Sequence, residues 1–95
     1  MVGMLAVAQG AIAGGDAAAG KAKAVVCSAC HGLDGNSKNP LWPHLAGQHA
    51  AYLVKQMKAF KSGARKDPLM QGMMAALTDE DMENLAAYYA SQKLK

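Results

Sequence analysis

Two cysteines and a histidine stand together in the sequence as Cys27-Ser28-Ala29-Cys30-His31. Two thiols three residues apart, at the end of a helix, can each add to a vinyl group on one edge of a haem. The imidazole that follows can then bind the iron as an axial ligand. This C-x-x-C-H pattern predicts one covalently attached haem c, held by Cys27 and Cys30, with His31 as an iron ligand.

Other chemistry is open to the same residues. A thioredoxin-like dithiol needs strands around it, and no alternating apolar pattern predicts one. A zinc site could combine Cys27 and Cys30 with two of His31, His44 and His49, but the pattern of a zinc finger is missing. A disulfide would close a tiny loop and add little stability. Haem is favoured, because the motif, the expected export and the helical pattern agree.

An electron carrier needs a second axial ligand on the iron. Three methionines precede the last expected helix and are candidates: Met70, Met73 and Met74. A thioether ligand raises the reduction potential relative to a second histidine, and it fills the site that oxygen or a substrate would occupy. His44 and His49 compete for this role, but they lie close in sequence to His31 and near the loop that follows it.

Three helices are expected to position these groups, over residues 16–30, 48–61 and 78–92. Between them, residues 32–47 and 64–76 read as loops, because glycine, proline and asparagine punctuate them. A loop as long as 32–47 is uncommon in a small domain unless it has a purpose, such as wrapping a cofactor. The chain is therefore expected to be all-α.

The ends of these helices carry recognisable capping residues. Asp16 and Thr78 are expected N-caps, and the acidic residues 79–81 suit the positive end of the last helix dipole. Gly63 is the expected stop of the middle helix. That helix has an apolar stripe that includes Tyr52 and Leu53.

Composition and charge narrow the function classes. The chain has 95 residues, which fits one domain, with a net charge of +3 and a pI of about 9.0. It has no dense run of basic residues and few aromatics, so nucleic-acid binding is not expected. A modest positive charge fits docking to an acidic protein partner better.

Residues 1–13 are uncharged and mostly apolar, and they end in Ala11-Ile12-Ala13. This is typical of the apolar core and cleavage site of a secretory signal peptide, and it is too short for an ordinary membrane span. We expect residues 1–13 to be a signal-peptide remnant, residues 14–95 to be the domain, and the mature protein to be periplasmic, without a membrane span.

From Gly15 to Gln92 the sequence resembles the class I cytochromes c. It is most similar to one domain of the dihaem periplasmic cytochromes of proteobacteria and to their monohaem relatives. The segments that carry the resemblance are Gly15 to Lys21, Cys27 to Asn36, Pro43 to Gln48, Tyr52-Leu53 with Gln56, Met70 to Met73, and Leu77 to Gln92, with its LAAYYASQ ending. Only one haem motif is present, so the dihaem form is not expected.

The resemblance implies a fold of three main helices with loops wrapped around one haem, and it implies roles for single residues. Met70, in Met70-Gln71-Gly72-Met73, is the expected sixth ligand, with Met73 as second choice. The carbonyl of Pro43, twelve residues past His31, is expected to accept the imidazole Nδ1–H, which strengthens the ligand. Further haem-binding residues are expected at Trp42, Leu45, Tyr52, Leu53 and Met57, and Arg65 is expected to pair with a haem propionate. Gly20 is expected to meet Tyr88 or Tyr89 where the terminal helices cross.

The function implied is that of a single-electron carrier and not of an enzyme. It would shuttle electrons between periplasmic or membrane redox partners, such as a terminal oxidase, reductase or dehydrogenase with an acidic docking surface. A basic docking face is expected from Lys38, Lys55, Lys58, Lys61, Arg65 and Lys66. The alternative is an electron-entry subunit of a periplasmic oxidoreductase complex. A third reading, an enzyme or gas sensor, requires that Met70 does not bind the iron.

Overall fold

The structure, a computed structural model, describes residues 15–95. The predicted signal remnant, residues 1–13, lies outside these residues. The described chain is helical and contains no strand, as expected. Its elements in order are α2 (Ala17–Lys23), the 3₁₀ turn η1 (Ala24–Val26), α3 (Ser28–His31), α4 (Ala50–Ser62), α5 (Pro68–Met74) and α6 (Asp79–Ala90).

The helix predicted over 16–30 is broken into three pieces. Asp16 caps α2 as expected, and its Oδ1 accepts a hydrogen bond from the Ala18 N–H at 2.9 Å. The prediction of one continuous helix was wrong, because Val25 and Val26 lie in a tighter turn. Two successive β-branched residues disfavour an α-helix, and the turn re-aims the chain before Cys27.

The middle helix is confirmed, with its start moved to Ala50. It ends where predicted, at Gly63, which has a φ of 84° and donates its N–H to the Phe60 carbonyl. Only glycine adopts that left-handed conformation without strain.

The prediction of a loop over 64–76 was wrong, since α5 occupies Pro68–Met74 within it. Asp67 starts this helix: its Oδ1 accepts the N–H groups of Leu69 and Met70 at 3.1 and 3.2 Å. Pro68 follows at the first helical position, where its missing N–H costs nothing. The proline was interpreted as a helix breaker, whereas after an aspartate cap it favours a helix start.

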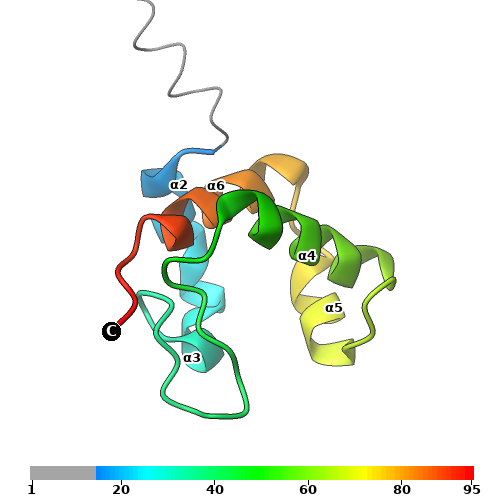
Figure 1. Cartoon of the computed structure of the whole chain (residues 1–95). Coiled ribbons are helices and arrows are strands. Elements are labelled where there is room, and N and C mark those ends of the chain that lie inside the picture. Colours follow the sequence, from blue (N-terminus) through cyan, green and yellow to red (C-terminus); the bar gives the residue numbers. More distant parts are fainter. Residues whose placement is uncertain (1–14) are drawn as a thin grey trace, which may run out of the picture.

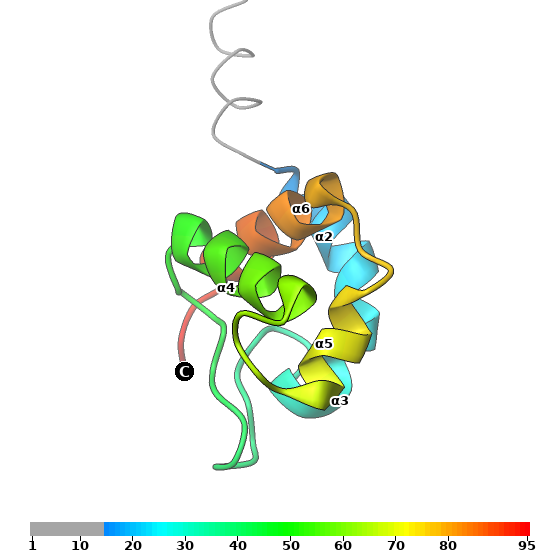
Figure 2. The same cartoon turned by 90° about the vertical axis from the view of Figure 1, so that its right-hand side faces the viewer.

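The last helix, α6, begins with a full capping box. Thr78 Oγ1 accepts the Asp81 N–H, and Asp81 Oδ2 accepts the Thr78 N–H, both at 3.0 Å. Figures 1 and 2 show α2 crossing α6, with α4 alongside α6 and α5 beneath α4. The two helices approach closely at Gly20, which has no side chain. A Cβ added there would lie 1.9 Å from the Asn84 carbonyl oxygen and 2.9 Å from Tyr88 Cβ. The predicted meeting of Gly20 and Tyr88 is confirmed.

The hydrophobic core forms around α6. Leu85 and Ala86 are fully buried, and Met82 and Met74 are nearly so. The remaining members of the core cluster are Ala24, Leu53, Val54, Phe60, Leu77, Tyr88 and Tyr89. Among residues 15–95 no helix is long and apolar enough to cross a membrane.

Candidate haem-attachment site

The two cysteines and the histidine lie on one short helical turn. Cys27 caps α3, and its carbonyl accepts the N–H groups of Cys30 and His31 at 3.3 and 3.0 Å. Both thiols are free and half-buried, while His31 is buried. Burial raises the pKa of the Cys27 thiol. The turn presents two thiol sulfurs and an imidazole next to one another, the donor set that covalent haem attachment needs.

The orientation of His31 is fixed from the long loop. Its Nδ1 lies 2.9 Å from the Pro43 carbonyl oxygen. Because a carbonyl can only accept a hydrogen bond, Nδ1 carries the proton and Nε2 keeps its lone pair for a metal. The loop is closed by the Gly35 carbonyl, which accepts the N–H groups of Leu45 and Ala46 at 2.7 and 3.1 Å.

The three candidate methionines occupy different environments. Met74 is buried in the core, so it acts as core filler. Met70 is half-buried in the first turn of α5 and packs against the core, whereas 43% of Met73 is exposed. The free thiols, the oriented imidazole and a half-buried thioether all fit a haem in this part of the molecule.

Comparison with known families decides the identity. Residues 17–93 match the family described as cytochrome c. The chain belongs to the cytochrome c family. Haem c attached through Cys27 and Cys30 is therefore the cofactor of this chain, and the all-α class I cytochrome c fold is its fold.

Relatives define its place within the family. The chain is 56% identical over 82 residues to cytochrome c4 of Pseudomonas aeruginosa, a match that covers 86% of this chain and 41% of that relative. It is 49% identical to cytochrome c-554(548) of Halomonas halodenitrificans, over 83% of this chain and 99% of that relative. Cytochrome c4 from Pseudomonas stutzeri superposes with a TM-score of 0.82 at 48% identity, over 85% of this chain and 47% of that structure.

This cytochrome c chain thus spans about two fifths of the length of the cytochrome c4 of Pseudomonas aeruginosa and nearly all of the cytochrome c-554(548). A monohaem relative of one cytochrome c4 domain fits both findings. A protein described as a thiosulfate dehydrogenase electron acceptor, from Stutzerimonas stutzeri, is 46% identical over 65 residues, or 67% of this chain and 30% of that relative.

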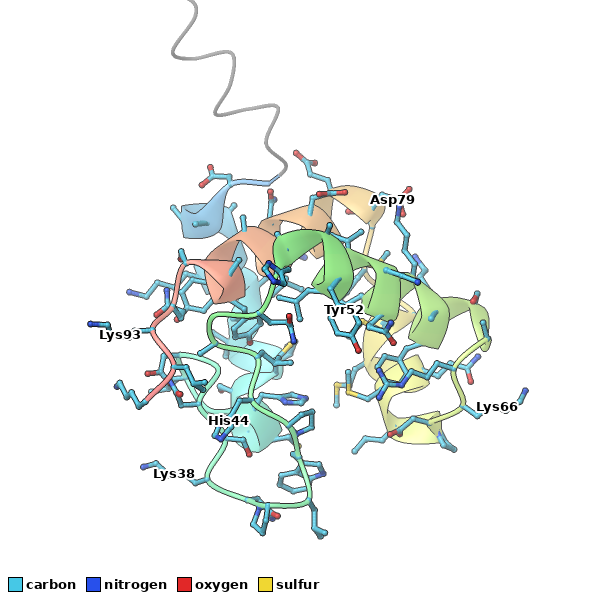
Figure 3. All side chains as sticks on the ribbon, in the orientation of Figure 1. Lys38, His44, Tyr52, Lys66, Asp79 and Lys93 are labelled. Carbon is cyan, nitrogen blue, oxygen red and sulfur yellow. The ribbon has the colours of Figure 1, made fainter. Side chains whose placement is uncertain are left out.

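The other predicted pocket residues differ in how far they are buried. Leu53 is buried, while Leu45 and Met57 are half-buried against the core. Trp42 and Tyr52 are 37% and 47% exposed, and in the view of Figure 3 Tyr52 points from α4 toward the side where the long loop and α5 lie. Their contact with haem stays a prediction.

The Arg65 side chain contacts Gln56 and Phe60. Its Nη1 donates to Gln56 Oε1 at 2.7 Å, and its guanidinium carbon lies 4.4 Å from the centre of the Phe60 ring. Both contacts hold Arg65 against the end of α4. The predicted pairing with a propionate remains a prediction, and it would use the guanidinium nitrogens that Gln56 leaves free.

The competing histidines are both exposed. His44 Nδ1 accepts the Ser37 N–H at 2.9 Å, which closes a turn of the long loop, and His49 is exposed at the start of α4. Between residues 15 and 95 no three His, Cys, Asp or Glu side chains are grouped to hold a metal ion. The zinc interpretation therefore finds no support in the described chain.

The predicted basic docking face is only partly assembled. Lys61 donates through Nζ to the Leu77 carbonyl, so it serves packing between α4 and the start of α6. Lys38 and Lys66 extend to opposite sides of the molecule in Figure 3. The exposed lysines of α4, Lys55 and Lys58, and the exposed Arg65 and Lys66 that follow this helix remain as its members.

Tyr89 is a residue that the sequence interpretation named only for helix packing. Its ring is buried and its hydroxyl lies inside the protein. The sequence did hold a signal for a further role. Tyr89 directly follows Tyr88, which packs at the helix crossing, and an apolar residue at position 89 would fill the core equally well.

Proposed function

We propose that this chain is a single-electron carrier whose haem c has His31 and Met70 as its two axial ligands. The observation that carries this proposal is the hydrogen bond from His31 Nδ1 to the Pro43 carbonyl, because it orients the ring and leaves Nε2 as the iron donor. Met70 is half-buried on α5, as a second ligand should be. When bound, haem c supplies one-electron chemistry by alternating between its ferrous and ferric states.

The protein side chains would restrict that chemistry to outer-sphere transfer. With His31 and Met70 both bound to the iron, no coordination position would be left for oxygen or a substrate. If both ligands stayed bound in both oxidation states, little rearrangement would accompany each transfer. These features support a carrier and not an enzyme.

The ligand assignment is tested by the far-red absorption band of the ferric protein, which marks methionine bonding to the iron. Met70→Ala should abolish the band and let carbon monoxide bind the ferrous protein, while Met73→Ala, the matched control, should keep the band. The opposite pattern would overturn the assignment to Met70. A wild-type protein without the band that binds carbon monoxide readily would overturn the closed site.

We also propose that the carrier works in the periplasm and that residues 1–13 are a signal remnant, with the domain at 14–95. The apolar run that ends in Ala11-Ile12-Ala13 supports this. Mass spectrometry of protein from a periplasmic extract should find a chain that starts near Gly14. Haem-loaded protein that keeps residues 1–13 and stays in the cytoplasm would contradict the proposal.

Docking to an acidic redox partner, such as a terminal oxidase, reductase or dehydrogenase, is proposed for the basic side of α4. Exposed Lys55 and Lys58 on α4, with the exposed Lys66 in the loop after it, support it. The electron-transfer rate with an acidic partner protein should fall as salt rises, and Lys55→Glu combined with Lys58→Glu should weaken that salt dependence. The distant Lys93→Glu is the control, and an equal effect there would refute this docking face.

The second candidate function is an electron-entry subunit of a periplasmic oxidoreductase complex. The similarity to a thiosulfate dehydrogenase electron acceptor favours it. Purification from the native source under mild conditions distinguishes the two. A carrier elutes at the size of the free chain, whereas a subunit elutes with a permanent partner.

A further inference from the structure

A buried hydroxyl beside the attachment motif has no role in the function proposed above. Only 3% of Tyr89 is exposed, and its hydroxyl oxygen is buried without a partner of hydrogen-bonding geometry among residues 15–95. Leaving a buried hydroxyl unpaired destabilises the folded state, because the group has lost its hydrogen bonds to water. Its neighbour shows the usual solution: the Tyr88 hydroxyl donates to the Leu33 carbonyl at 2.9 Å.

The ring of Tyr89 is held in place from several sides. A Cβ on Gly35 would lie 2.8 Å from Tyr89 Cδ1, so this glycine lets the loop backbone lie directly against the ring. The Tyr88 ring lies 5.1 Å away, centre to centre, at an angle of 57°. The Tyr89 carbonyl accepts the Gly47 N–H at 2.9 Å. With backbone and ring both fixed, the position of the hydroxyl is fixed too.

The half-buried Cys27 side chain packs against the same core cluster that contains Tyr89, and its sulfur is the polar group that interacts with the Tyr89 hydroxyl. Burial raises the pKa of the Cys27 thiol, and interaction with the Tyr89 hydroxyl acts in the opposite direction. Burial also raises the pKa of Tyr89 well above its usual value, with the Cys27 charge as a second cause. The phenol therefore keeps its proton and can act as a donor.

Haem attachment changes what the Cys27 sulfur can do. A thiol carries its own hydrogen, whereas a thioether has none and can only accept. We propose that in the haem-loaded protein the Tyr89 hydroxyl donates a hydrogen bond to the Cys27 thioether sulfur, so that Tyr89 is a positioning residue for this side of the cofactor. The inference rests on the covalent attachment described above. It gives the buried hydroxyl its partner, and it draws electron density from a sulfur bonded to the haem.

The test uses haem-loaded Tyr89→Phe, which removes only the oxygen, with Tyr88→Phe as the matched control. Tyr89→Phe should lower the folding equilibrium constant about fivefold in denaturant titrations, as expected for one lost hydrogen bond. An unpaired hydroxyl would give the opposite sign, because its removal relieves a desolvation cost. Tyr89→Phe should also lower the reduction potential, whereas Tyr88→Phe should leave the potential unchanged.

A second measurement needs no variant. In NMR spectra of the ferrous wild-type protein, the Tyr89 hydroxyl proton should exchange slowly and show cross-peaks to the Cys27 β-protons. A pyridine haemochrome spectrum and the protein mass establish beforehand that both thioethers are present, and their absence would refute the attachment itself. Attached haem, together with an equally or more stable Tyr89→Phe protein, an unchanged potential and no such cross-peaks, would overturn the role of Tyr89.

Discussion

Replacing Gly20 with alanine is the sharpest test of how the two terminal helices are joined. At Gly20 the backbones of α2 and α6 touch: an added Cβ would lie 1.9 Å from the Asn84 carbonyl oxygen, 2.5 Å from the Asn84 carbonyl carbon and 2.9 Å from Tyr88 Cβ. The first two are backbone atoms of a capped helix, and they cannot rotate away. The helices themselves must therefore separate.

The size of the effect follows from these distances. Ordinary contact begins at 3.4 Å, so the crossing must open by about 1.5 Å, more than enough to forfeit half of the attraction between facing atoms. Overpacking of this kind costs about 1–3 kcal/mol or more. The better helix propensity of alanine raises the unfolding free energy by about 1 kcal/mol and offsets part of this cost. We expect Gly20→Ala to lower the unfolding free energy by about 2 kcal/mol, a large share of the roughly 5–15 kcal/mol that holds a domain together.

Chemical denaturation of the haem-loaded protein, followed by far-ultraviolet circular dichroism, measures this loss. Gly72→Ala is the control, because it makes the same change in α5 at a site where an added Cβ meets nothing within 4 Å. That variant should gain up to about 1 kcal/mol. If Gly20→Ala proves as stable as the wild type, the close crossing of α2 and α6 described here is refuted.

Three further outcomes are expected. Asp67→Ala removes the side chain that accepts the Leu69 and Met70 N–H groups, and it should lower the unfolding free energy by about 1 kcal/mol in the same titration. Leu85→Ala, at a fully buried position, should cost about 2–5 kcal/mol, and a loss below about 1 kcal/mol would mean that the core relaxes around it. The hydrogen bond from the Thr78 N–H lowers the pKa of Asp81 in the folded state. Its stabilising contribution is therefore present above the ordinary aspartate pKa of about 3.9 and is lost on acidification, so Asp81→Ala should make stability less dependent on pH between about pH 5 and pH 2.

Helix ends that depend on neighbouring residues were predictable from the sequence. Asp16, Thr78 and Gly63 each cap or stop a helix where expected, because a cap is a contact between residues two to four positions apart. The same local logic would have located α5, whose aspartate cap and proline at the first helical position were interpreted as loop residues. That error came from treating proline as a breaker without regard to its position.

The attachment site was predictable for a different reason. Cys27, Cys30 and His31 are neighbours in sequence, so their geometry needs only one helical turn. The bond between His31 and Pro43 spans twelve residues, and it was expected from family resemblance alone. The environment of Tyr89 could not be predicted, because the position of its hydroxyl depends on how α6 crosses α2 and on how closely the loop approaches.

Gly35 links these separate features into one arrangement. Its φ of 84° turns the loop, its carbonyl accepts two N–H groups that close the loop, and its missing side chain admits the ring of Tyr89. The closed loop carries Pro43, which orients His31. Through Tyr89 and Gly35, α6 therefore contacts the loop that orients the imidazole. Since a packed interior transmits strain, a change where the terminal helices cross should alter the orientation of the His31 imidazole as well as overall stability. Packing at Gly35 thus links the helix crossing to the histidine of the C-x-x-C-H motif.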